Sequence, residues 1–199
     1  MKNSKIRTIA MAAIMGAIAF VLQFFSFGIP FFSPFANFDF SALPEIIGGF
    51  ILGPIGAIEI IIIKLALILA FKGTSSMFTG EIQNFILSCA YVLPAILYYR
   101  KHRTKKGAMI GLCIGTVTSV VIAIFTNLYL IFPAYIYLYK MTWESIISIC
   151  NAVNPFIHNK LTFVLWSVIP FNAVSRIVTS VITFFLYKRI SKPIKQFIQ

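Results

Sequence analysis

Six long apolar stretches fill most of this 199-residue sequence, and they restrict the chain to an integral membrane protein. Residues 8–29 carry no formal charge, and a helix of that length crosses a hydrocarbon core of roughly 30 Å. A cleaved signal peptide would have a shorter apolar region and a small-residue end, whereas this stretch stays bulky and aromatic. We predict one all-α membrane domain over residues 1–199, with six transmembrane helices near 8–29, 42–54, 56–71, 79–99, 107–131 and 163–187.

The basic residues predict how these helices are oriented. Most of the 17 Lys and Arg residues fall in three places, the N-terminus, the run Arg100–Lys106 and the tail. The terminal groups are Lys2, Lys5, Arg7, Lys188, Arg189, Lys192 and Lys195. Because Lys and Arg stay on the cytoplasmic side, we predict a cell-membrane protein with cytoplasmic N- and C-termini. The long outer segment 132–162 is expected to contain a short helix near Trp143, since a structureless segment of that length is unusual.

Composition and motifs exclude several classes of function. A content of 59% hydrophobic and 11% charged residues exceeds what a soluble core of this size needs. The net charge of +12 flanks apolar spans, so we expect no nucleic-acid partner. His102 and His158 fall far apart in this topology, which leaves no metal site or catalytic dyad. Cys89, Cys113 and Cys150 are expected to be small buried hydrophobic residues. The sequence has no nucleotide-binding motif, so ATP-driven work needs another chain.

Polar residues at membrane depth are the strongest indication of function. Such groups are costly in a bilayer, and they tend to line a cavity or to pair with one another. Here they gather in the predicted outer half of the membrane. The set comprises Asn37, Asp39, Ser41, Glu45, Glu81, Asn84, Asn127, Asn172, Ser175 and Arg176. This distribution predicts a binding pocket that is loaded from outside.

Several of these residues also have a structural interpretation. Glu81 lies at a predicted helix start, where a carboxylate stabilises the positive end of the helix dipole. Asn84 lies three positions later on the same helix face as Glu81. The two residues therefore support a binding site as well as they support a helix cap. Asp39 and Ser41 precede Pro44 and could simply cap the next helix.

The sequence does not assign a single role to three charged residues. Glu59 and Lys64 are five positions apart, too far around one helix for an ideal pair. We favour structural bridges to other helices or snorkelling ends for these two residues. Arg176 could snorkel to the interface or balance a buried carboxylate, and the sequence leaves both open.

The first predicted helix carries small residues at helical spacing. Ala13 and Ala17 share one face, and Ala12 and Gly16 share another, so a second helix can approach closely. Packing within the chain and contact with another subunit explain this pattern equally well.

In chain order, a set of motifs resembles one family. The motifs are Phe38-Asp39-Phe40-Ser41-Ala42-Leu43-Pro44-Glu45, Gly48-Gly49-Phe50-Ile51-Leu52-Gly53-Pro54, Gly80-Glu81-Ile82-Gln83-Asn84-Phe85, Asn127 with Phe132-Pro133-Ala134-Tyr135, and Pro170-Phe171-Asn172. Together they resemble the riboflavin-type substrate-binding (S) component of energy-coupling factor (ECF) transporters. The resemblance covers most of the chain and includes its length and six-helix topology.

The resemblance implies a vitamin-binding membrane protein that works with a transmembrane coupling subunit and two ATPase subunits. It implies that the coupling subunit contacts Ala13 and Ala17. It assigns substrate roles to Asp39, Ser41, Leu43, Pro44, Glu81, Asn84, Asn127 and Asn172. Ser175 stands where the family usually has Lys, three positions after the Asn of the Pro-Phe-Asn motif.

The ligand that the resemblance implies is a vitamin with a flat heteroaromatic ring. Riboflavin is the first choice, because Asn side chains present donor and acceptor edges and aromatic residues near the outer loops suit a ring system. Those aromatic residues are Phe31, Phe32, Phe35, Phe38 and Phe40. Another heteroaromatic vitamin stays open, since a Ser175 hydroxyl cannot replace a Lys ammonium. We expect no catalytic residue, metal or cofactor, and we expect the first outer loop to close over the ligand as a lid.

Two other classes of function stay open from the residues alone. A membrane-embedded enzyme could use Glu45 and Glu81 as acid and base if both faced one cavity. A channel is less well supported, because no predicted helix has a continuous polar stripe.

Overall fold

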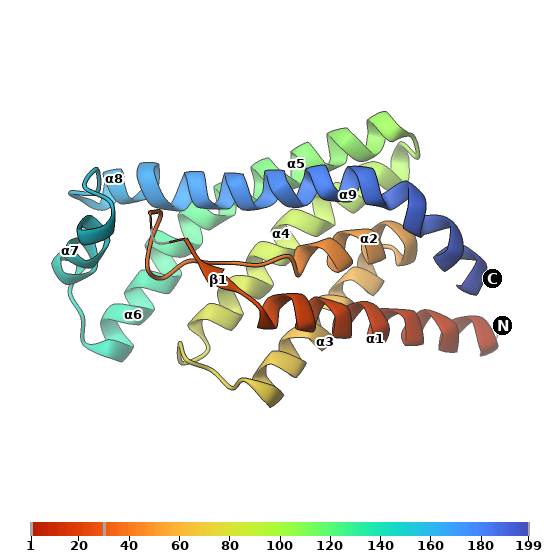
Figure 1. Cartoon of the computed structure of the whole chain (residues 1–199), viewed down its shortest axis with the longest axis horizontal. Coiled ribbons are helices and arrows are strands. Elements are labelled where there is room, and N and C mark those ends of the chain that lie inside the picture. The colour runs from red at the N-terminus through yellow and green to blue at the C-terminus, as the bar shows by residue number, and fades with distance from the viewer. Residues whose placement is uncertain (1, 30, 199) are drawn as a thin grey trace.

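The chain forms a mostly helical bundle (Figure 1). The computed structural model describes the backbone of residues 2–29 and 31–198 and the side chains of residues 6–29 and 31–187. Lys2, Lys5, Lys188, Arg189, Lys192 and Lys195 lie outside the described side chains. In chain order the elements are α1 (Lys2–Phe24), β1 (Phe27–Gly28), β2 (Asn37–Phe38), α2 (Ala42–Leu52), α3 (Pro54–Phe71), α4 (Thr79–Lys101), α5 (Lys105–Thr126), the π-helix η1 (Asn127–Ile131), α6 (Phe132–Tyr139), α7 (Trp143–Val153), α8 (Lys160–Phe163), the π-helix η2 (Val164–Val168) and α9 (Ile169–Ile198).

Five helical segments in the described part of the chain are long and apolar enough to cross a bilayer. They are Ile6–Phe24, Pro54–Phe71, Thr79–Lys101, Lys105–Tyr139 and Lys160–Tyr187. The remaining apolar helix, α2, has only 11 residues, and about 16 Å of helix reaches roughly half-way through the hydrocarbon core. The prediction of several apolar helices is therefore met, and five of the six predicted spans have sufficient length.

Helix boundaries differ from the prediction where the sequence remains apolar but the chain turns. The first helix ends at Phe24 instead of residue 29, because Phe27 and Gly28 form β1 and pair with Phe38 and Asn37 of β2. The fifth span does not end at residue 131 but continues to Tyr139. The short helix expected in the outer segment is α7, where Thr142 forms a capping box with Ser145.

The sixth predicted helix also begins earlier than expected. It starts at Lys160, where Asn159 and Thr162 form a second capping box, and it continues beyond residue 187. Between α2 and α3, Gly53 has φ +89° and Pro54 is the first helical residue, so the chain turns tightly there. Of the cysteines expected to be buried, Cys150 is buried but Cys113 is exposed on α5.

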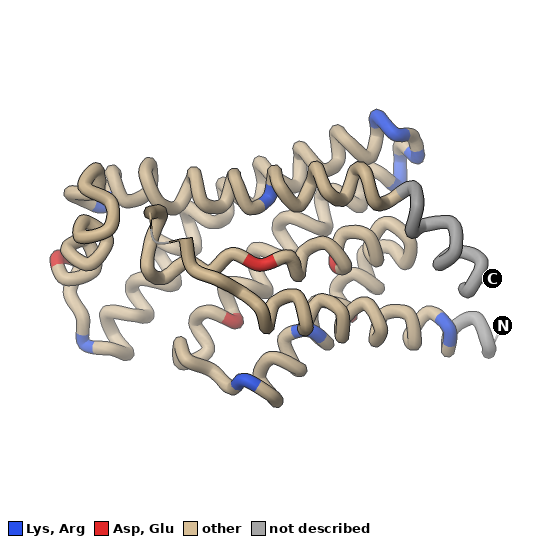
Figure 2. The backbone as a smooth tube through the Cα atoms, in the orientation of Figure 1, with Lys and Arg blue, Asp and Glu red and all other residues tan. Residues whose placement is uncertain are grey.

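Both termini lie at the same end of the bundle as the loop between α4 and α5 (Figure 1). Figure 2 shows Lys and Arg residues gathered in that loop. We call this end, which carries residues 100–106, the basic end. At the opposite end α6, α7 and α8 pack together (Figure 1).

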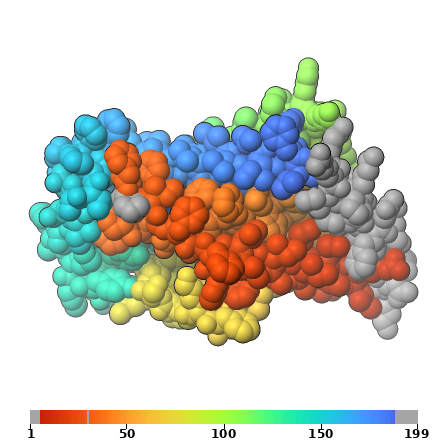
Figure 3. Space-filling model, in the orientation of Figure 1, coloured from red at the N-terminus to blue at the C-terminus, as the bar shows by residue number. Residues whose placement is uncertain are grey.

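Close helix contacts hold the bundle together. A Cβ on Gly111 would lie 2.7 Å from the Ala95 carbonyl oxygen, and a Cβ on Gly115 would overlap the Tyr91 carbonyl oxygen. These two glycines therefore set the approach of α5 to α4. One buried apolar cluster joins α2, α4 and α5 toward the basic end, and a second joins α5, α6, α7, α8 and η2 at the far end. Figure 3 shows the segment between α1 and α2 packed against α7–α9 on one face.

Candidate substrate-binding cavity

A cavity of about 580 Å³ lies in the half of the bundle remote from the basic end. Its α4 residues come from the start of that helix, between Gly80 and Ser88, whereas the basic loop follows the other end of α4. The other walls come from the end of α1, residues 33–41, the loop after α3, η1, α6, η2 and α9. Pockets of several hundred Å³ suit ligands of vitamin size.

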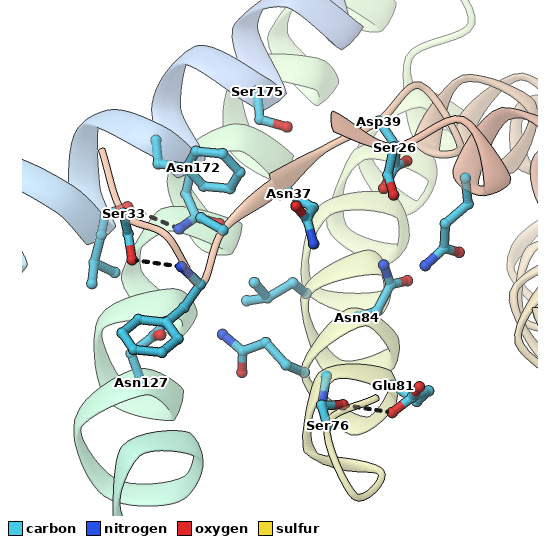
Figure 4. Close-up of a pocket in the computed structure, with 18 of the residues that line it drawn as sticks. Ser26, Ser33, Asn37, Asp39, Ser76, Glu81, Asn84, Asn127, Asn172 and Ser175 are labelled. Atoms are coloured by element: carbon cyan, nitrogen blue, oxygen red, sulfur yellow. Dashed lines mark hydrogen bonds between the residues drawn. The ribbon is translucent and has the colours of Figure 1, made fainter. Parts of the chain in front are cut away.

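Most of the predicted site residues meet at this cavity. The predicted polar residues that line it are Asn37, Asp39, Ser41, Glu81, Asn84, Asn127, Asn172, Ser175 and Arg176. Figure 4 shows the asparagines Asn37, Asn84, Asn127 and Asn172 arranged around a common space. Leu43 and Pro44 do not line it, because they lie within α2, where Pro44 is buried and Leu43 is half-buried.

A buried ion pair beneath the cavity fixes the orientation of Asn84. Lys64 Nζ lies 2.5 Å from Glu45 Oε1, and both side chains are fully buried. Lys64 Nζ also donates to Asn84 Oδ1 at 2.5 Å and to Ser41 Oγ at 3.4 Å. An ammonium has three donors and no acceptor, so these contacts use its full capacity. Asn84 must accept through Oδ1, and its two N–H groups remain for the cavity.

Two other asparagines are oriented the opposite way. Asn172 Nδ2 donates to the Val168 carbonyl at 2.8 Å, and Asn127 Nδ2 donates to the Ala123 carbonyl at 2.7 Å. A carbonyl oxygen only accepts, so Nδ2 must be the atom that faces the helix. Each Oδ1 is then left as an acceptor for the cavity. The cavity therefore presents donors on α4 and acceptors on η1 and α9.

The two acidic residues of the site are held by local hydrogen bonds. Glu81 Oε2 accepts from Thr74 Oγ1 at 3.1 Å and from Ser76 Oγ at 3.0 Å. Glu81 thus ties the loop after α3 to the first turn of α4, where its charge also suits the helix dipole. Asp39 Oδ1 accepts from the Ser41 backbone N–H at 2.7 Å, which forms a turn immediately before α2. Glu81 therefore has the helix-start role considered from the sequence. Ser41 is the N-cap residue of α2, but neither its side chain nor that of Asp39 makes a capping hydrogen bond to that helix. Asp39, Ser41 and Glu81 all line the cavity.

Arg176 lines the cavity and has no carboxylate partner among the described residues. Its Nε donates to Ser119 Oγ at 3.2 Å, and its guanidinium carbon lies 5.0 Å from the centre of the Tyr91 ring. Neither interface snorkelling nor a buried ion pair describes this arrangement. A cation–π contact and a hydroxyl hold the side chain instead.

Residues 31–41, which we call the cover loop, lie over the cavity and are fastened to the far end of the bundle. Asn154 is fully buried and donates through Nδ2 to the Phe31 carbonyl at 3.0 Å. Ser33 is buried with its Oγ 3.9 Å from Cys150 Sγ of α7. The Phe35 ring packs edge-on against Phe132 and Tyr135. No sequence motif indicated that α7 and Asn154 anchor this loop.

The aromatic walls differ from those expected. Of the five phenylalanines named from the sequence, only Phe35 lines the cavity. Phe31 is 53% exposed, and Phe38 packs against Phe27 and Phe40. The other aromatic lining residues are Phe132, Tyr135, Phe163 and Phe171. Rings in the outer loops are easily counted in a sequence, but only tertiary packing decides which of them face inward.

Two glutamines in the cavity wall were not among the residues predicted from the sequence. Gln23 at the end of α1 and Gln83 on α4 both line the cavity. Each has a buried Oε1 with no hydrogen-bond partner among the described residues. A buried polar atom without a partner costs free energy, so a ligand donor at either position would be stabilised. Both could have been found in the sequence, because a polar amide in or near a membrane-spanning segment is the feature that identified the asparagines.

The small residues of α1 divide into a buried face and an exposed face. Ala12 is 1% exposed, and Gly16 is buried against α3, where its Cβ would meet Ile63. Ala13 and Ala17 are exposed. Internal packing therefore explains Ala12 and Gly16, and it does not account for Ala13 and Ala17.

The sequence pattern of the family described as the substrate-specific component of ECF transporters matches residues 7–187. The chain belongs to this family. This S component is 29% identical over 195 residues to riboflavin transporter RibU of Staphylococcus aureus (strain TCH60), an alignment that covers 98% of the chain and 94% of that protein. It is 27% identical over 200 residues to riboflavin transporter FmnP of Bacillus subtilis (strain 168), with 96% of each covered.

A solved structure shares the fold of the S component. It is described as the S component of a bacterial ECF transporter, with a TM-score of 0.72 and 28% identity over 98% of this chain and 99% of that one. The family predicted from the motifs is therefore confirmed, and it is a transporter component and not an enzyme.

Proposed function

We propose that this S component binds riboflavin or a related flavin in the 580 Å³ cavity and passes it to an ATP-driven coupling module. Relatives that align with nearly the whole chain are named riboflavin transporters. The observation that carries the proposal is the fixed orientation of the amides, with donors at Asn84 and acceptors at Asn127 and Asn172. A flavin ring presents carbonyl acceptors beside an imide N–H donor, which matches amides of both orientations.

Binding in this cavity needs no bond chemistry. The aromatic rings of Phe132 and Phe171 provide apolar contact for a flat ring. The acidic and hydroxyl groups of Glu81 and Ser76 suit the hydroxyls of the sugar-alcohol chain. Closure of the cover loop would exclude water and strengthen each polar contact, because hydrogen bonds are stronger in a low dielectric.

Energy for uptake comes in this proposal from a transmembrane coupling subunit and two ATPase subunits. The exposed Ala13 and Ala17 of α1 offer a smooth helix face for the coupling subunit. The protein resides in the cell membrane with its basic end and termini in the cytoplasm, so that the cavity opens to the outside.

A different heteroaromatic vitamin is the second candidate, and Ser175 favours it. Ser175 lines the cavity where the riboflavin branch usually has Lys, and a neutral hydroxyl cannot supply a cation to a carbonyl or phosphate. The enzyme alternative needed Glu45 and Glu81 in one cavity. Glu45 does not line it and is paired with Lys64.

Fluorescence titration of the purified protein with riboflavin tests the proposal. Asn84→Ala and Asn172→Ala should each weaken binding by roughly 5- to 100-fold, the effect of leaving a buried hydrogen-bonding group without its partner. Asn151→Ala is the matched control, because Asn151 contacts Ile157 and His158 outside the cavity. Absence of riboflavin binding by the unaltered protein, or full affinity in both cavity variants, contradicts the proposal.

A further inference from the structure

A second cavity, of about 450 Å³, lies at the basic end between α9 and the start of α5. Its wall is largely apolar and includes Ala108, Leu112 and Phe184. Its rim is basic, with Arg103 and Lys105 among the lining residues. Phe185 lines the cavity and is 71% exposed, so this opening faces the lipid side of the bundle. An apolar wall with a cationic rim is the pattern expected for an amphiphilic anion.

The start of α5 adds backbone donors to this rim. Thr104 is the N-cap, its Oγ1 accepts from the Gly107 N–H, and its carbonyl accepts from the Ala108 N–H. The N–H groups of Lys105 and Lys106 therefore have no acceptor within the helix. In a helix of 22 residues, these two groups and the positive end of the dipole favour a bound anion.

Thr183 of α9 provides an independent indication that this cavity takes a ligand. A threonine within a helix commonly donates to the carbonyl four residues earlier, as Thr179 does to Ser175 at 2.9 Å. Thr183 lines the second cavity and is fully buried. Its Oγ1 has no hydrogen-bond partner within the described part of the chain. The wall of this cavity thus contains a buried hydroxyl whose donor is unused.

We propose that this cavity binds an anionic glycerophospholipid from the leaflet at the basic end. The phosphate lies at the start of α5 beside Arg103 and Lys105, and one acyl chain runs along the wall formed by Leu112 and Phe184. An ester carbonyl accepts the Thr183 hydroxyl. A free phosphate would leave the apolar wall without a partner, whereas a phospholipid satisfies the charge, the hydroxyl and the wall together.

Native mass spectrometry of the full chain tests this site. The purified protein is offered equal amounts of phosphatidylglycerol and phosphatidylcholine with identical acyl chains, and retained lipids are counted. The unaltered protein should prefer phosphatidylglycerol. The double variant R103Q/K105Q should bind it about 30-fold more weakly. The matched control is K101Q/K106Q, which removes the same charge from side chains that do not line the cavity and should keep the preference.

A second variant and a soluble anion separate the possible outcomes. Thr183→Val, which keeps the shape but removes the hydroxyl, should weaken both lipids equally by a few-fold, because both carry ester carbonyls. Riboflavin affinity at the distant cavity reports that each variant is folded. Equal loss of phosphatidylglycerol in the two double variants would show that only bulk charge matters, and this overturns the proposal. Displacement of the lipid by millimolar glycerol phosphate would identify a soluble-anion site and overturn it equally.

Discussion

Replacement of Lys64 by Met tests whether the buried ion pair orients the Asn84 amide toward the cavity. Met keeps an unbranched side chain of similar length but removes the ammonium, so three acceptors lose their donor. The Glu45 carboxylate is fully buried and would be left without a counter-charge. Removal of one partner from a buried pair costs roughly 3–5 kcal/mol. We therefore expect Lys64→Met to lower the unfolding temperature strongly and to impair flavin binding.

The double variant Glu45→Met/Lys64→Met separates stability from recognition. Replacement of both charges by apolar side chains of similar size is often neutral or stabilising, so the unfolding temperature should recover. Asn84 would still lack Lys64 and would keep only the Ser88 hydroxyl, 3.5 Å from its Oδ1. Its amide could then rotate away from the donor orientation. The loss of one well-placed hydrogen bond, about 1–1.5 kcal/mol, predicts roughly tenfold weaker flavin binding in a stable protein.

Intrinsic fluorescence of the 2 Trp residues during heating measures stability, and riboflavin titration measures affinity. Glu59→Gln is the control, because Glu59 lies on the same helix α3 but forms no ion pair with Lys64. This control should leave both readouts unchanged. If the double variant binds riboflavin as tightly as the unaltered protein, Lys64 does not orient Asn84. If Lys64→Met alone unfolds at the normal temperature, the Glu45 carboxylate does not need its counter-charge.

Four further predictions test the docking face, the cover loop, the departure at position 175 and the packing of α5. Ala13→Trp should abolish uptake in cells but leave riboflavin binding intact, whereas Ile14→Trp on the neighbouring exposed position should still support uptake. With the other two cysteines replaced by alanine, Cys150 should react slowly with a maleimide, because burial raises the pKa of its thiol; riboflavin should slow the reaction further if the cover loop closes. Ser175→Ala should weaken riboflavin binding by less than about tenfold, the effect of one neutral hydroxyl, as measured by titration. Gly115→Ala should lower the unfolding temperature, since its Cβ would overlap a carbonyl of α4 and overpacking typically costs about 1–3 kcal/mol.

The spans and the composition of the site were readable from the sequence because membranes impose strong rules. Apolar length fixes where a helix can cross, and the cost of polar groups in lipid identifies residues such as Asn84 and Asn172. The pairing of Lys64 could not be read in the same way. Spacing along α3 directs attention to Glu59, but the actual partner is Glu45 on α2. Only the packing of α2 against α3 brings these two side chains together.

The length of α2 and the position of the cover loop could not be predicted from the sequence, for a related reason. Hydropathy does not distinguish a half-length helix from a full span when both are apolar, and α2 contains 11 residues. Asn154 is a second residue whose role hydropathy does not reveal. A polar residue outside the spans gives no membrane signal, yet it is fully buried and holds the cover loop at Phe31.

The two π-helices place residues on the cavity that a regular helix would separate. Phe163 and Ser175 both line the cavity, but at about 100° per residue an α-helix would leave their directions about 120° apart. The wider turn of η2, residues 164–168, takes up part of this rotation. Likewise η1 begins at the wall residue Asn127 and ends immediately before the wall residue Phe132. Single π turns often occur at functional sites. Here their physical consequence is that, in each of the two long helical segments, aromatic rings and amides face the same cavity.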